Sequence, residues 1–419
     1  MIVIGAGAAG LAAGARLHRA GIDVLVVEAA ARTGGRAFTD TASFGVAWDR
    51  GCHWLHSASV NPFRAAADEL GLAYLHRGTR QARATHLGER WADEAEREAV
   101  WQAIDGGFAA IHQAGDEGRD IAGSEVIDTA SPWIRLIRHW VTLMTAAEAE
   151  KVSTLDFAAY SDTSENYPVE KGYGALVQAV ARRAAPDLAI LTGCPVARLD
   201  WSGREVALET PRGRLTARRV IVAVPTTVIA RGGLAFAPAL PAELAEAFAA
   251  LPLGAAEKVA FRFDRDVFGV PATTYVDTID VNNPDRRPIN FTLNPFGANM
   301  AIGQLGGDNA ATLVKAGPQA MADFGLAALK DAFGADVGAH VTGVATTSWV
   351  ADPLIGGAYS CALPGFAHMR ARLAQPLAER VFFAGEAVSA HAYSTAHGAH
   401  LSGQAAADAV LATLAGRAA

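Results

Sequence analysis

Three glycines near the start of the chain have the spacing of a phosphate-binding loop. Gly5, Gly7 and Gly10 form a G-x-G-x-x-G pattern. The pattern follows the apolar run Ile2–Ile4, and an Ala-rich helix is expected to begin at Ala8. The first glycine allows a tight turn, the second lets a pyrophosphate approach the backbone, and the third lets helix and strand pack closely. The helix N-terminus adds unpaired N–H groups and partial positive charge, so this segment predicts a dinucleotide site.

An acidic residue and a second glycine turn follow this loop. Glu28 ends the next apolar run, where its carboxylate is placed to accept hydrogen bonds from ribose hydroxyls. Gly34 and Gly35 then stand between Arg32 and Arg36. A nicotinamide-binding unit would normally continue directly into its next helix. The second turn instead brings the guanidinium group of Arg36 back toward the pyrophosphate. This favours a dinucleotide other than a nicotinamide dinucleotide.

The far end of the chain predicts the other half of the same site. A short apolar strand ends in Gly385 and Glu386, and a long Ala-rich helix begins near Thr395 and Ala396. A helix N-terminus favours a nearby negative charge, and a reduced isoalloxazine ring carries one. We therefore expect the first and last segments to form one flavin site.

Together these motifs resemble the flavin-containing amine oxidase superfamily, which includes monoamine oxidases, polyamine oxidases and lysine-specific histone demethylases. Residues 51–56, with Asn61 and Pro62, are most similar to animal polyamine oxidases. The matching stretches are residues 5–10, 28, 32–36, 51–56, 171–176, 220–225, 254–263, 349–360 and 382–403.

The resemblance implies FAD as the cofactor. It implies non-covalent FAD, because Ala358 stands where monoamine oxidases carry their flavin-linking cysteine. Val196 would contact the adenine side of FAD through its backbone. The alternative is that Val196 is an ordinary core residue. The residues expected at FAD are Gly5, Gly7, Ala8, Gly10, Glu28, Arg32, Gly34, Gly35, Arg36, Trp54, Val196, Trp349, Gly385, Glu386, Thr395 and Ala396.

The resemblance also assigns the reacting side of the flavin. It implies that Lys258 holds a water against flavin N5 and assists oxygen during reoxidation; a lysine at a strand end is the alternative. Tyr359, with Trp349, would form one wall of an aromatic cage, and Thr395 takes the place of the second cage tyrosine. His56 would contact a substrate nitrogen, or else is an ordinary buried histidine. No metal site is expected, because His397 and His400 lack a supporting carboxylate pattern.

The fold class expected is α/β, α+β overall: a Rossmann-like FAD-binding domain interleaved with a substrate domain of mixed or antiparallel sheet plus helices. Residues 1–75, 165–255 and 345–419 are assigned to the FAD-binding domain, and 76–164 and 256–344 to the substrate-binding domain. The patterning predicts helices at residues 93–114, 131–150, 172–184 and 318–332, strands at 289–293 and 300–305, and a loop at 156–169.

Composition limits the function classes. The 419 residues are 51% hydrophobic and 19% charged, which suits two folded domains with large cores. A net charge of −7 argues against nucleic acid as a partner and is compatible with a cationic substrate. Three cysteines without paired spacing suit a reducing, cytoplasmic setting, and no apolar run is long enough to cross a membrane. A monomer or homodimer is expected.

The leading hypothesis is an FAD-dependent amine oxidase acting on CH–NH bonds. It would convert a polyamine-type amine, with O2, into an imine, then an aldehyde, and H2O2. The alternatives are an L-amino-acid oxidase or another flavin-dependent desaturase, or a flavin-binding module without turnover. An amino-acid oxidase needs an arginine for the substrate carboxylate, and Arg135 and Arg138 are open candidates.

Overall fold

A parallel sheet forms one half of the molecule. The computed structural model describes residues 1–76 and 83–415. Its five-stranded sheet draws strands from the start, middle and end of the chain. The apolar runs 2–4, 220–222 and 381–383 are buried throughout, whereas the edge strand at 189–191 is largely exposed. The strand order is β19 (Val381–Phe383), β12 (Val220–Val222), β1 (Ile2–Ile4), β2 (Leu25–Val27) and β8 (Ala189–Leu191), all parallel.

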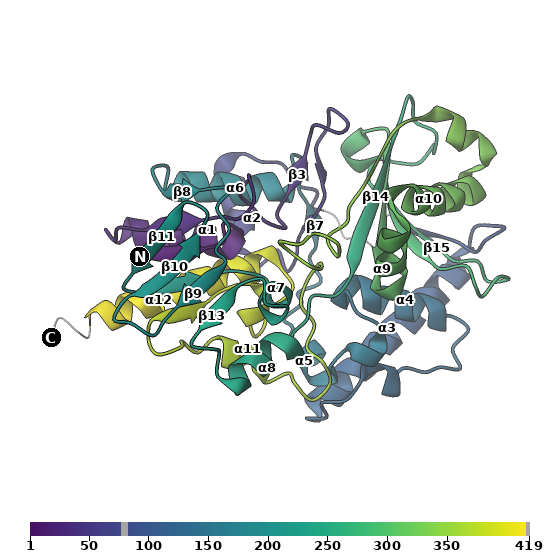
Figure 1. Cartoon of the computed structure of the whole chain (residues 1–419). Helices are drawn as coiled ribbons and strands as arrows, with labels where there is room; N and C mark the ends of the chain where they lie inside the picture. The colour runs from purple at the N-terminus through teal and green to yellow at the C-terminus, as the bar shows by residue number, and fades with distance from the viewer. Residues whose placement is uncertain (77–82, 416–419) are drawn as a thin grey trace.

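Two helices from opposite ends of the chain pack together on this sheet. They are α1 (Ala8–Arg19) and α12 (Ala396–Ala415), shown in purple and yellow in Figure 1. A Cβ on Gly403 would lie 2.1 Å from the carbonyl oxygen of Ala9, so the glycine allows this close approach. A Cβ on Gly10 would lie 1.8 Å from the oxygen of Gly5, so α1 can leave the turn only without a side chain there.

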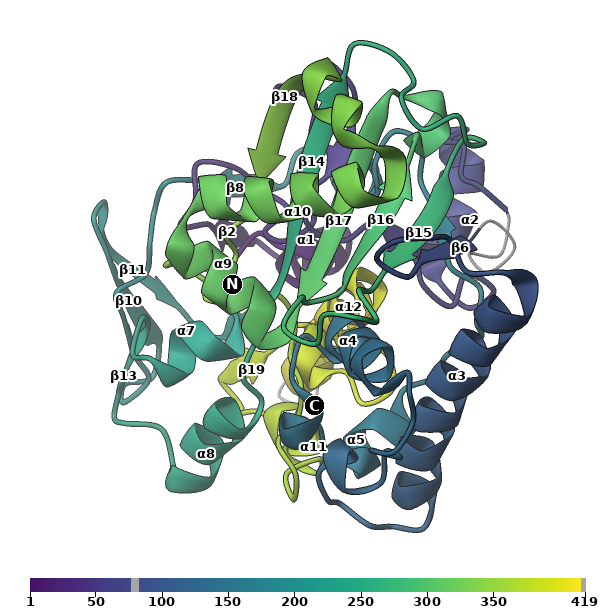
Figure 2. The same ribbon diagram turned by 90° about the vertical axis from the view of Figure 1, so that its right-hand side faces the viewer.

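A second sheet of six strands forms the other half of the molecule (Figure 2). Neighbouring strands are antiparallel except for the parallel pair β15 and β6. Helices α9 (Gly307–Ala316) and α10 (Pro318–Phe333) cover one face, which carries a large apolar cluster. The order is β18 (Val341–Thr346), β14 (Ala256–Phe263), β17 (Met300–Gly306), β16 (Ile289–Leu293), β15 (Thr274–Thr278) and β6 (Arg83–His86).

The remaining elements complete both halves. A four-stranded sheet has the order β11 (Gly213–Ala217), β10 (Val206–Thr210), β9 (Arg198–Asp200) and β13 (Ala235–Ala237). The short strands are β3 (Thr39–Asp40), β4 (Trp48–Asp49), β5 (Trp54–Leu55) and β7 (Tyr167–Pro168). The other helices are α2 (Pro62–Leu70), α3 (Glu94–Asp116), α4 (Ile134–Thr145), α5 (Thr154–Ala159), α6 (Tyr173–Ala184), α7 (Thr226–Ala230), α8 (Ala242–Ala250) and α11 (Met369–Leu373).

Most of the expected elements lie where the patterning placed them, but one segment differs. Residues 156–169 were expected to be a loop, yet they contain most of α5 and the strand β7. The Ser153 side chain caps α5 by accepting a hydrogen bond from the amide of Asp156 at 2.9 Å. The assignment of segments to an FAD-binding and a substrate-binding domain stays a prediction.

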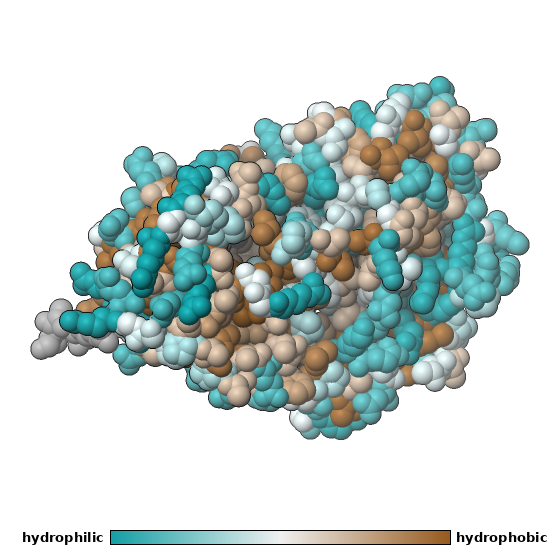
Figure 3. All heavy atoms as spheres, in the orientation of Figure 1, coloured by the Kyte–Doolittle hydropathy of each residue, from teal (hydrophilic) through white to brown (hydrophobic). Residues whose placement is uncertain are grey.

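The surface is mixed in character. Figure 3 shows hydrophilic side chains over much of one face, with hydrophobic residues in separate patches. Among the helices within residues 1–76 and 83–415, none combines the length and apolar character needed to cross a membrane.

The glycine turn yields a paired test of stability. Gly10→Ala should lower the free energy of unfolding of the apoprotein by about 3 kcal/mol, because the new methyl group meets the oxygen of Gly5. Gly7→Ala should cost only about 0.5 kcal/mol, since a Cβ there has no atom within 4 Å. Urea unfolding measures both variants, and equal destabilisation would contradict the packing argument.

Candidate active site

The two predicted phosphate-binding turns lie side by side. The amide of Gly34 donates to the carbonyl oxygen of Ala6 at 2.8 Å, and Gly7 and Gly34 form an isolated parallel bridge. Glu28 accepts from the amide of Ala6 at 2.6 Å through one carboxylate oxygen. Its other oxygen accepts from the amide of Ala30 at 2.8 Å. The structure therefore brings Gly5–Gly10, Glu28 and the second glycine turn into one loop cluster above β1 and β2.

A buried carboxylate joins the second glycine turn to two distant segments. Glu386 is 5% exposed and pairs with Arg36 at 3.0 Å. It also accepts from the hydroxyl of Ser360 at 2.6 Å and from the amide of Ser394 at 2.9 Å. Burial alone raises the pKa of Glu386, but the charge of Arg36 and the Ser360 hydroxyl outweigh it and hold the pKa below its usual value.

A second buried ion pair, which the sequence reasoning missed, supports the first. Both oxygens of Asp156 accept from Arg370, at 2.6 and 2.8 Å. The same guanidinium donates to the hydroxyl of Ser360 at 2.9 Å and lies over the ring of Tyr393 at 3.8 Å from its centroid. Arg370 therefore fixes Ser360, which in turn contacts Glu386. No local pattern marks this pair, because its partners are 214 residues apart.

Lys258 reaches from the six-stranded sheet to the first segment of the chain. Its ammonium donates to the carbonyl oxygens of Asp49 at 2.8 Å and Gly51 at 2.7 Å. Burial lowers the pKa of Lys258 to about 8, although the nearby Asp49 carboxylate opposes the shift. The lysine is thus a cation at neutral pH whose charge is lost in mildly alkaline solution.

The two aromatic residues after β18 are anchored by their polar atoms. The indole N–H of Trp349 donates to the carbonyl oxygen of Arg50 at 3.0 Å, next to the carbonyls that bind Lys258. The hydroxyl of Tyr359 donates to the carbonyl oxygen of Leu143 in α4. Burial raises the pKa of Tyr359, so this phenol stays neutral. The polar end of the ring is fixed against α4.

His56 and Trp54 lie together on the segment that follows Gly51. Their ring centroids are 5.9 Å apart. The Nδ1 atom of His56 donates to the side-chain oxygen of Asn166 at 2.5 Å, and burial lowers the pKa of His56. Within the described part of the chain, the indole N–H of Trp54 is buried without a hydrogen-bond partner. This donor is available to an acceptor group of a bound ligand.

The start of α12 and the segment of Val196 complete the predicted set. The Thr395 hydroxyl accepts from the amide of Gly398 at 2.9 Å, so it caps the helix that begins at Ala396. Val196 is buried, and the amide of Cys194 two residues earlier donates to the carbonyl oxygen of Glu28 at 2.9 Å. Val196 is thereby placed near the end of β2, as the adenine-side prediction requires, while its role stays a prediction.

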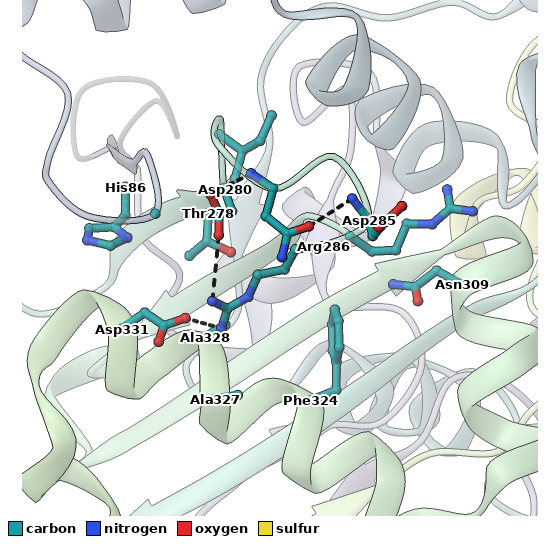
Figure 4. Close-up of a pocket in the computed structure, with 14 residues that line it drawn as sticks. His86, Thr278, Asp280, Asp285, Arg286, Asn309, Phe324, Ala327, Ala328 and Asp331 are labelled. Atoms are coloured by element: carbon teal, nitrogen blue, oxygen red, sulfur yellow. Dashed lines mark hydrogen bonds and ion pairs between the residues drawn. The ribbon is translucent and has the colours of Figure 1, made fainter.

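A hollow of about 440 Å³ lies elsewhere (Figure 4). Thr278 and His86 line it on the α10 face of the six-stranded sheet, opposite to Lys258, and Phe324 of α10 forms a wall. In Figure 4 the Arg286 side chain points between Asp280 and Asp331 and pairs with both. This hollow is therefore separate from the residues that the sequence predicted.

Comparison with known proteins identifies the family. The family described as flavin containing amine oxidoreductase matches residues 8–411. The chain belongs to this family. Probable polyamine oxidase 4 of Arabidopsis thaliana is 28% identical over 96% of this chain and 85% of its own length. Polyamine oxidase 2 of the same plant is 29% identical over 97% of this chain and 87% of its own length.

Two further comparisons bear on size and fold. Lysine-specific histone demethylase 2 of Homo sapiens is 26% identical over 96% of this chain, which spans 52% of that protein. Cyclohexylamine oxidase from Brevibacterium oxydans IH-35A has a TM-score of 0.79 and 24% identity, with 99% of both chains covered. This likeness confirms the predicted fold class. The predicted family, its kinship with polyamine oxidases and its cofactor FAD are also confirmed, and the protein is a flavin-dependent amine oxidoreductase.

The residues present fit FAD. A Cβ on Gly7 would project into open space beside the N-terminus of α1, where a pyrophosphate could approach the backbone amides. Gly35 stacks closely on Gly7, with its Cβ position 3.3 Å from the Gly7 Cα. The unpartnered indole N–H of Trp54 supplies a buried donor in the described part of the site. We propose that the two glycine turns, Glu28 and Arg36 would hold FAD.

The open space beside Gly7 predicts a separation of folding from cofactor binding. Gly7→Ala should fold normally but bind FAD about tenfold more weakly, since the methyl group keeps the pyrophosphate from the amides. Fluorescence titration of the apoprotein with FAD measures the Kd. Unchanged affinity would contradict the place given to the pyrophosphate.

The buried Arg370–Asp156 pair predicts a large loss of stability when one partner is removed. Arg370→Met should lower the free energy of unfolding by about 3–5 kcal/mol, because it leaves a buried carboxylate uncompensated. Arg372→Met, on the same helix, is the matched control. Its partner Glu243 is 67% exposed, so the loss should stay below about 1 kcal/mol. Similar losses in urea unfolding would contradict the assigned importance of the buried pair.

Proposed function

We propose that the protein is an FAD-dependent amine oxidase that oxidises a C–N bond of a polyamine-type amine and uses O2 as the electron acceptor. The products would be an imine, which water converts to an aldehyde, and H2O2. The placement of Lys258 carries this proposal, because a flavin-binding protein without turnover needs no buried cation beside the flavin segment. The polyamine oxidases among the relatives support the substrate class.

The cofactor supplies the redox chemistry. FAD, when bound, accepts a hydride from the carbon next to the amine nitrogen and passes the electrons to O2. We propose that it is bound non-covalently, since Ala358 has no thiol and its carbonyl oxygen instead accepts a hydrogen bond from Arg36.

The chain's own groups prepare the substrate and oxygen for this chemistry. The amine must be neutral when it reacts, because its lone pair supports the developing iminium. Desolvation by buried residues lowers the pKa of an alkylammonium from about 10.4. The ring of Tyr359, fixed by α4, supplies an apolar and cation-attracting wall. Lys258 places its positive charge where negative charge develops on oxygen.

The arginines that could serve an amino-acid oxidase have other partners. Arg135 donates to the carbonyl oxygens of Asn283 at 2.9 Å and Arg286 at 3.2 Å. Arg138 pairs with Glu150 at 2.7 Å. Both guanidinium groups thus bind other parts of the protein, and neither favours a substrate carboxylate. We therefore propose an amine oxidase rather than an amino-acid oxidase.

The role of Lys258 is testable by separating the two half-reactions. Lys258→Met should slow reoxidation of reduced flavin by O2 about 100-fold, because a preorganised charge is removed. Anaerobic reduction by amine should change much less. Lys330→Met, at an exposed position of α10, is the matched control. Stopped-flow absorbance measures both steps, and unaltered reoxidation in the Lys258 variant would refute its role.

The pH dependence gives a second readout of the same variant. The pKa of Lys258 is lowered to about 8, so its charge is present below this pH and is lost as the pH rises through it. The reoxidation rate of the parent protein should therefore fall across this range. The Lys258→Met profile should lack that step, and an identical step in both would assign it to another group.

A further inference from the structure

A row of polar side chains crosses the six-stranded sheet next to Lys258. Lys258 pairs in register with Gln304, Gln304 with Asn290, Asn290 with Asp277, and Asp277 with Thr85. Partners directly opposite in a sheet point to the same face. These five side chains therefore lie on the Lys258 face, across five neighbouring strands.

The opposite face of the same strands is apolar. Val259 and Phe261, which alternate with Lys258, belong to the cluster that packs against α10. A Cβ on Gly303 would approach Ile289, Phe291 and Val259, all of this cluster, within 3.0 Å. The polar row is thus a feature of the face turned toward the candidate active site, not a solvated edge.

Gln304 is the accessible member of this row beside Lys258. All other residues of β17 are buried, whereas Gln304 is half-buried. Its side-chain nitrogen reaches the Thr292 hydroxyl only at 3.5 Å, a marginal hydrogen bond. By contrast, Asn290 donates to Asp277 at 2.7 Å, and Arg83 donates to both oxygens of Asp277 at 3.2 Å. At the far end of the row, Asn290 and Asp277 already have hydrogen-bond partners. The Gln304 carboxamide remains available to bind a substrate group.

Helix α4 brings Gln304 and Tyr359 to the same place. A Cβ on Gly306, two residues after Gln304 on the same face, would lie 2.6 Å from the carbonyl oxygen of Thr142. The next residue of α4, Leu143, accepts the hydroxyl of Tyr359. Gln304 thus lies on the strand that packs against the end of α4 where Tyr359 is anchored, and Lys258 is its neighbour in register.

The buried carboxylates of the described chain are all engaged. Each accepts from a cation, a hydroxyl or backbone amides of the protein. The carboxylates and their partners are Asp40 with Arg50, Asp49 with the amides of Tyr173 and Gly174, Asp156 with Arg370, Glu257 with Thr347 and the amide of Val350, Asp277 with Arg83, and Glu386 with Arg36.

We propose that Gln304 is a specificity-determining residue whose carboxamide hydrogen-bonds an uncharged polar group of the amine substrate. This inference rests on the proposed amine oxidation. A carboxamide both donates and accepts, which suits an amide, hydroxyl or ether group. A second ammonium at this place would lie about 5 Å from the strand of Lys258, which carries a like charge, and the carboxylate of the row, Asp277, is already paired with Arg83. The site therefore prefers amines whose remote polar group carries no charge.

Three amines of equal carbon backbone test the preference. They are butylamine, 1,4-diaminobutane and mono-N-acetyl-1,4-diaminobutane, compared by the rate of anaerobic flavin reduction in the holoenzyme at neutral pH. The acetylated amine should reduce the flavin about tenfold faster than the diamine at subsaturating concentration. Its amide can form a hydrogen bond with Gln304, and it brings no second ammonium group near Lys258.

Two substitutions at the same position assign the preference to Gln304. Gln304→Leu should remove the advantage of the acetylated amine over butylamine. Gln304→Glu supplies a carboxylate and should raise the rate with the diamine about tenfold. Gln319→Leu, at an exposed position of α10 where the Gln319 side chain donates to Asp323, is the matched control and should behave as the parent.

The outcomes separate the inference from the function beneath it. If the amines reduce the flavin but the diamine equals or exceeds its acetylated form, the specificity role is overturned and the amine oxidase remains. The role is also overturned if Gln304→Leu keeps the parent's preference. If none of these or longer polyamines reduces the flavin, the proposed function fails and the inference fails with it.

Discussion

The carboxylate of Glu386 is the contact on which the cofactor half of the molecule depends. It binds Arg36 from the first segment, Ser360 from the segment after β18, and the amide of Ser394 before α12. A buried carboxylate is tolerated only when its partners are in place, because an uncompensated charge costs several kcal/mol. The three segments must therefore assemble together before the cofactor site is complete.

Charge in the site is arranged in two ways. Most buried ions are in closed pairs, such as Arg370 with Asp156, and these fix the backbone without leaving a net charge. Lys258 differs, because within residues 1–76 and 83–415 its ammonium donates to backbone carbonyl oxygens. Carbonyl dipoles stabilise a cation less than a carboxylate does, and burial lowers the pKa of Lys258 to about 8. The paired charges thus stabilise the structure of the site, whereas the charge of Lys258 changes with pH.

The sequence predicted the parts of the site that local spacing encodes. The glycine turns, Glu28 and Arg36 lie within one short stretch, so their pattern already determined the strand, turn and helix that the structure contains. The family resemblance then placed Lys258 and Tyr359. The loop expected at residues 156–169 is present at 160–166, but its first residues belong to α5 and residues 167–168 form β7. The helix was missed because α5 is only six residues long, too short to show a period. Ser153, three residues before Asp156, was the available capping signal.

The parts that could not be predicted depend on pairing between distant strands. Nothing near Gln304 distinguishes it from any other glutamine, because its importance comes from the register that places it beside Lys258. Likewise, the sequence does not show that Asp277 is paired, because its partner Arg83 lies 194 residues away. That pairing changes the expected chemistry. In the proposed selectivity, the Gln304 carboxamide therefore recognises an uncharged polar group by hydrogen bonding, where an unpaired acid would instead attract a second ammonium group.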